Sequence, residues 1–140
     1  MALKDYDNKT LITILELWQN IEQSTIQATG VLLNKVEDRV LKAFIGDIRG
    51  DSRKHKELLD LVLRIEKNDE AFLDNDAKTV LEEFILIHGK LEEHAVEIAE
   101  VAKEKATHPL SRLILDYILQ DEKKHDHLID SLREFCDPVD

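Results

Sequence analysis

The chain has 140 residues, of which 43% are hydrophobic and 35% charged, with only 4 glycines and 2 prolines. This composition predicts a single all-helical domain over residues 1–140 and argues against a disordered or β-rich chain. The formal net charge of −11 argues against nucleic acid or an anionic membrane as a partner and favours cations.

The N-terminal stretch, the lengths of the apolar runs and the single cysteine limit where the protein is located and which kinds of site it can form. The N-terminal stretch "MALKDYDNKT" lacks the apolar core of a signal peptide, and no apolar run approaches the roughly 20 residues of a membrane span. We therefore expect a cytoplasmic protein. The single cysteine, Cys136, excludes an internal disulfide and a cysteine-rich metal site.

Four segments repeat apolar residues at intervals of three and four, the spacing of an amphipathic helix. They cover about residues 8–34, 38–66, 77–104 and 109–136. No segment shows the alternation of a strand. Pro109 suits the first turn of the fourth helix, with Thr107 or His108 as its cap.

In the first two segments, polar residues interrupt the apolar face near its middle. The first carries Glu22 on this face, and Trp18, one turn earlier, is expected to pack in the core. The second carries Ser52 and His55 at the corresponding place. Burying an unpaired carboxylate costs several kcal/mol, so Glu22 predicts a partner or a bound cation.

The last two segments show the same interruption. The third carries His88 and Glu92 on its apolar face, and the fourth carries Glu122 and His125. Three residues is close to one helical turn, so a Glu-x-x-His sequence presents both side chains on one face.

A repeat of seventy residues relates the two halves of the chain. The stretch "DSRKHKELLD", residues 51–60, matches "DEKKHDHLID", residues 121–130, and Glu22 matches Glu92 in the preceding helices. The chain is therefore predicted to be two related helical hairpins, built by internal duplication. Where the second copy has Glu122, the first has Ser52.

Helix bundles that hold two iron or manganese ions use one Glu from each of two helices and a Glu-x-x-His from each of the other two. Over about residues 8–135, the chain resembles the ferritin-like superfamily, and its rubrerythrin branch most closely. The resemblance rests on Glu22, "DSRKH", Glu92 and "DEKKH", at spacings of thirty, forty and thirty positions. It implies a four-helix bundle in which these side chains converge on a carboxylate-bridged di-iron centre.

The resemblance also implies roles for individual residues. It assigns as metal ligands Glu22, His55, Glu92, Glu122 and His125, with Glu92 and Glu122 as the candidates for bridging. Ser52 stands where the family has a metal-binding Glu, and either Asp51 or His88 could supply a substitute ligand. The rubredoxin tail of full rubrerythrins has no counterpart here, so a redox cycle would use an external electron donor. Family members often form homodimers.

Three functions are open at this point. The protein could be a di-iron oxidoreductase that acts on peroxide, oxygen or ferrous iron. It could instead bind metal with little catalysis, at an asymmetric site that accepts iron, manganese or zinc. The alternative from another class is a metal-free helical interaction module that has lost part of the site. No catalytic residue is assigned.

Overall fold

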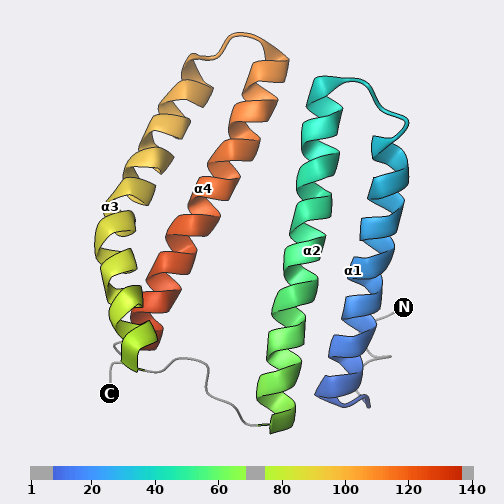
Figure 1. The fold of residues 1–140 in the computed structure, drawn as a ribbon. Helices are drawn as coiled ribbons and strands as arrows, with labels where there is room; N and C mark the ends of the chain where they lie inside the picture. Colours follow the sequence, from blue (N-terminus) through green and yellow to red (C-terminus); the bar gives the residue numbers. More distant parts are fainter. Residues whose placement is uncertain (1–7, 69–74, 137–140) are drawn as a thin grey trace. The chain divides into compact units, whose positions relative to one another are not determined.

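The computed structural model describes residues 8–68 and 75–136, and in these ranges every regular element is an α-helix (Figure 1). The helices are α1 (Leu11–Leu33), α2 (Arg39–Asn68), α3 (Asn75–Lys105) and α4 (Pro109–Cys136). Each end lies within three residues of the bound expected from the periodicity. None of the helices described is long and apolar enough to cross a membrane.

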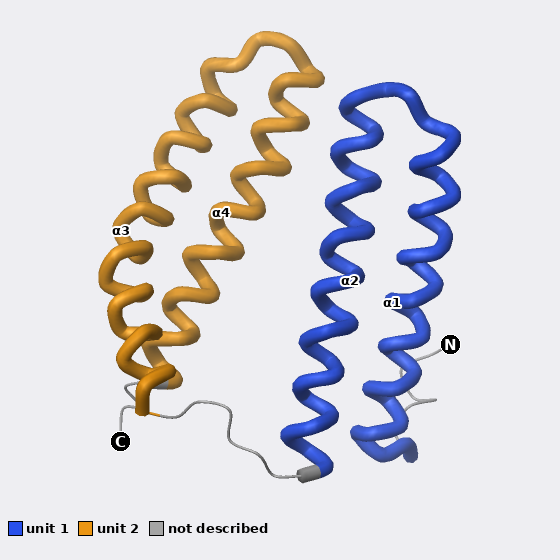
Figure 2. The backbone as a smooth tube through the Cα atoms, in the orientation of Figure 1, with its two compact units in different colours: residues 1–71 blue, residues 72–140 orange. Residues whose placement is uncertain are grey.

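The helices pack in pairs along the chain. Helix α1 packs against α2 and α3 packs against α4. The chain divides into two compact units, which we call unit 1 (residues 1–71) and unit 2 (residues 72–140), each built on one hairpin (Figure 2). The predicted fold class, all-α and built from two helical hairpins, is confirmed. The single ferritin-like domain over residues 1–140 stays a prediction.

Short polar residues fix where the second helix of each unit begins. Ahead of α2, the Asp38 carboxylate accepts a hydrogen bond from the backbone N–H of Leu41 at 3.0 Å. Ahead of α4, His108 Nδ1 accepts one from the N–H of Leu110 at 3.0 Å, and Pro109 occupies the first helical position. These bonds satisfy donors that the first turn of a helix leaves free. The prediction for the start of α4 is confirmed, with His108 as the cap.

The seventy-residue repeat is visible in the apolar core. Leu15 and Leu59 are buried in unit 1, and their repeat partners Ile85 and Ile129 are buried in unit 2. The same register therefore faces inward in both hairpins. The side chains that interrupt these buried faces must consequently occupy equivalent places in the two units.

We expect Ile129→Ala to lower the free energy of unfolding by about 2–4 kcal/mol, because truncating a buried aliphatic side chain leaves a cavity. Ile129 is 2% exposed, whereas Leu86, in the same unit, is 78% exposed and provides a matched control. Urea unfolding followed by circular dichroism measures both. Equal losses for Ile129→Ala and Leu86→Ala would contradict the assigned core.

Candidate metal centre

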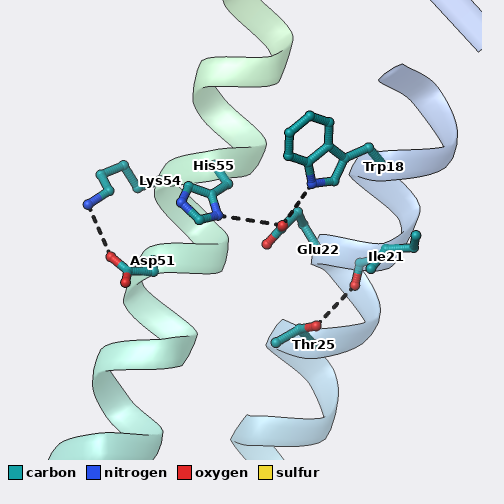
Figure 3. A network of polar contacts seen from close by, with 7 residues as sticks. All are labelled: Trp18, Ile21, Glu22, Thr25, Asp51, Lys54 and His55. Carbon is teal, nitrogen blue, oxygen red and sulfur yellow. Dashed lines mark hydrogen bonds and ion pairs between the residues drawn. The ribbon is translucent and has the colours of Figure 1, made fainter. Parts of the chain in front are cut away.

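In unit 1, one buried carboxylate is surrounded by hydrogen-bond donors (Figure 3). Glu22 projects from α1, and its Oε1 accepts a hydrogen bond from Trp18 Nε1 at 3.1 Å. His55, from α2, places its Nδ1 3.5 Å from the same oxygen. The buried Ser52, also on α2, hydrogen-bonds to the Glu22 carboxylate. The carboxylate is therefore compensated by side chains of its own unit.

These contacts determine the charge of Glu22. Burial alone would raise its pKa, but the hydrogen bonds from Ser52 and Trp18 and the neighbouring His55 outweigh it and hold the pKa of Glu22 below its ordinary value. Glu22 is thus stabilised as an anion without a metal.

In unit 2, the equivalent place holds two carboxylates and a histidine. Glu92 projects from α3, and Glu122 and His125 project from α4. One ligand atom from each of the three lies within 4.8 Å of the others. His125 Nδ1 lies 3.7 Å from Glu92 Oε2. Within residues 8–68 and 75–136, this is the one group of three such side chains close enough to hold a metal ion.

The electrostatics of this cluster differ from those in unit 1. Glu92 Oε2 is shielded from solvent and has no hydrogen-bond partner among the residues described. A hydrogen bond with Glu92, burial and the negative charge of Glu92 raise the pKa of Glu122, and His125 only partly opposes them. Two carboxyl groups this close favour sharing a proton. A divalent cation could replace that proton and serve both carboxylates.

The wider charge distribution also favours a cation in unit 2. Unit 1 has 13 acidic and 11 basic residues, a net charge of −2, whereas unit 2 has 17 acidic and 8 basic residues, a net charge of −9. Most of the negative charge of the chain therefore lies in the half that carries the cluster. Such a field raises the local concentration of cations.

The ligand types suit a transition metal. Carboxylate oxygen and imidazole nitrogen coordinate an ion such as zinc at about 2.0–2.2 Å, which places ligand atoms about 3–4 Å apart. Small side-chain rotations would bring three atoms within 4.8 Å to that spacing. Glu92, Glu122 and His125 fit iron, manganese or zinc, since imidazole and carboxylate both bind these metals. The side chain of His125 is 51% exposed, which leaves the cluster accessible to water and small molecules.

The two proposed substitute ligands have other contacts. Asp51 forms an ion pair with Lys54, whose Nζ lies 3.0 Å from Asp51 Oδ1, and its side chain points away from Glu22 (Figure 3). The ring of His88 lies against that of Phe84, with centroids 4.6 Å apart. Neither belongs to the group of three in the part of the chain that the structure describes. A single centre formed by all five assigned ligands stays a prediction.

Sequence reasoning missed the role of Trp18. Its predicted place in the core is wrong, because the side chain is 48% exposed and its indole N–H serves Glu22. The sequence feature that indicates this hydrogen bond is the spacing of four residues between Trp18 and Glu22, which puts donor and acceptor on one face of the helix.

Comparison with known proteins identifies no relative. The chain matches no protein-family model, no curated protein and no solved structure. The likeness to rubrerythrins therefore remains a resemblance that rests on a few residues. The evidence for a function lies in the polar groups around Glu22 and Glu92.

Glu22→Gln and Glu122→Gln should shift the stability of the metal-free protein in opposite directions. The folded state favours ionised Glu22, so its contribution is present at neutral pH and is lost as pH falls through its lowered pKa. Glu22→Gln should therefore lower the free energy of unfolding by roughly 1.5–3 kcal/mol near neutral pH, the size of a hydrogen bond to a charged group.

The folded state instead favours protonated Glu122, so stability is lost as pH rises from the ordinary pKa of 4.5 through the raised one. Glu122→Gln should stabilise the metal-free protein near neutral pH, and this gain should vanish in acid. Urea unfolding with chelator, from about pH 7 down to about pH 3, which lies below the ordinary pKa of 4.5, measures both effects. Shifts of the same sign would contradict the assigned charge states.

Proposed function

We propose that this protein binds one divalent transition-metal ion through Glu92, Glu122 and His125, with iron as its metal. The observation that carries the proposal is the shielded Glu92 Oε2, which has no hydrogen-bond partner among the described residues and faces a second carboxyl and an imidazole. An anionic oxygen that is shielded from water and accepts no hydrogen bond is costly, and the imidazole of His125 lies 3.7 Å away, beyond hydrogen-bond distance. A bound cation would remove that cost.

Each of the three side chains has a separate task. Glu92 and Glu122 supply the negative charge that neutralises the ion, and Glu122 gives up the proton that its raised pKa retains. His125 supplies a nitrogen ligand, which disfavours magnesium and calcium relative to iron, manganese and zinc. Because the side chain of His125 is 51% exposed, water or a small molecule could reach an ion held there.

The ferritin-like resemblance extends this proposal to redox chemistry. Reduction of peroxide to water, or of oxygen to peroxide, takes two electrons and two protons. A bound ferrous ion would supply one electron, an external donor would supply the other and then return the ferric ion to the ferrous state, and water would supply the protons. The protein would then be a small rubrerythrin-like oxidoreductase. A metal-free interaction module remains the alternative if no ion binds.

Glu122→Ala should weaken metal binding by roughly 100-fold or more, because removing a ligand exceeds the 10–100-fold loss typical of outer-shell changes. Calorimetric titration with Zn²⁺ and Mn²⁺, together with elemental analysis of protein purified without chelator, measures the affinity and the count. His127→Ala is the matched control, since His127 is exposed on the same helix and lies outside the cluster. Full occupancy in Glu122→Ala would rule out the assigned site.

Redox activity has its own test. We expect peroxide to accelerate the oxidation of ferrous iron added anaerobically to the wild-type protein, and Glu122→Ala to lose this acceleration. Absorbance of the ferric product follows the reaction over time, and free ferrous iron with peroxide is the baseline. Tight metal binding with oxidation no faster than the baseline would leave a metal-binding protein and exclude the oxidoreductase.

A further inference from the structure

The two units contain equivalent glutamate–histidine pairs whose paired atoms are separated by similar distances. His55 Nδ1 lies 3.5 Å from Glu22 in unit 1, and His125 Nδ1 lies 3.7 Å from Glu92 in unit 2. The repeat therefore provides two copies of one scaffold. Any difference in their chemistry must come from the side chains around the pair.

Two neighbouring positions differ between the copies. Residue 18 is Trp and its repeat partner 88 is His, whereas residue 52 is Ser and its partner 122 is Glu. Trp18 and Ser52 both hydrogen-bond to the Glu22 carboxylate. In unit 2 the repeat partners of these donors behave differently, since the ring of His88 lies against Phe84, and Glu122, which shares a hydrogen bond with Glu92, is itself an acid.

These two differences make the pair in unit 1 unfavourable for a metal ion and the pair in unit 2 favourable. In unit 1, a metal ion at Glu22 would have to displace the indole N–H that occupies Oε1 at 3.1 Å. At the two places where unit 2 has Glu92 and Glu122, it would also find one carboxylate, Glu22, since Ser52 offers a neutral oxygen. In unit 2, an ion finds two carboxylates, and among the described residues one of their oxygens, Glu92 Oε2, has no hydrogen-bond partner.

We propose that Trp18 and Ser52 are specificity-determining residues that keep unit 1 free of metal, so that the chain takes a single ion and takes it in unit 2. This inference rests on the proposed function and adds to it the stoichiometry and the residues that set it. It also removes Glu22 and His55 from the ligand set that the family resemblance implies. Their pair becomes a structural contact between α1 and α2.

Exchanging residues between the repeat copies tests this proposal. We would titrate Zn²⁺ into the full chain by calorimetry, with circular dichroism to establish that each variant is folded. Wild type should bind one ion, and Glu122→Ser, which gives unit 2 the residue of unit 1, should bind none. Trp18→His combined with Ser52→Glu, which gives unit 1 the residues of unit 2, should bind two.

A matched control variant tests whether a second ion binds because a carboxylate is gained or because the hydrogen-bond donors to Glu22 are lost. Trp18→Phe with Ser52→Ala removes both hydrogen bonds without adding a carboxylate, and it should still bind one ion. Combining Trp18→His, Ser52→Glu and Glu122→Ser should also give one ion, now in unit 1. A folded Trp18→His/Ser52→Glu variant that binds one ion overturns the inference, whereas a wild type that binds none overturns the proposed function.

The wild-type protein offers a second readout that does not depend on the folding of a variant. Nitrogen-15 spectra of the imidazole rings should show that one equivalent of Zn²⁺ shifts the signals of His125 and leaves those of His55 unchanged. Simultaneous shifts at both rings would mean that unit 1 shares the ion. Shifts at His55 alone would place the ion in the wrong half.

Discussion

A carboxylate buried between two helices must be compensated, and each half of this protein does so with a histidine from the facing helix. The pairs Glu22–His55 and Glu92–His125 cross their hairpins at nearly the same distance. In each pair the carboxylate is more shielded from solvent than the histidine, whose side chain is 43% exposed at His55 and 51% exposed at His125. The requirement to compensate Glu22 and Glu92 fixes which residues can surround them, and the chemistry of each unit follows from it.

The two units meet this requirement by different means. Unit 1 uses neutral donors, and the indole of Trp18 and the hydroxyl of Ser52 hold Glu22 as an anion. Unit 2 instead places a second acid, Glu122, beside Glu92, which adds negative charge to the site and does not compensate it. A duplicated scaffold has thus produced one self-sufficient polar contact and one that favours an external cation. Only two changed positions beside the pair are needed to explain the difference.

The sequence predicts the helices and their pairing well because both depend on long periodic patterns and on a repeat of many residues. It also locates Glu92, Glu122 and His125, since their spacing puts them on matching faces. It predicts less well the contacts that side-chain rotamers decide. Asp51 could reach inward or toward Lys54, and Trp18 could pack or donate, and spacing alone does not rank such choices. Likewise, the raised pKa of Glu122 follows from its burial and its closeness to Glu92, which the sequence does not contain.

Trp18 is the single tryptophan of the chain, and it lies in unit 1 against the pair that holds no ion in our proposal. Its indole fluorescence is therefore a natural spectroscopic probe of one half of the molecule. Circular dichroism, in contrast, averages over the helices of both halves. If the two hairpins melt as separate cooperative units, the two signals will change at different denaturant concentrations. Coincident transitions would instead indicate that the halves fold and unfold together.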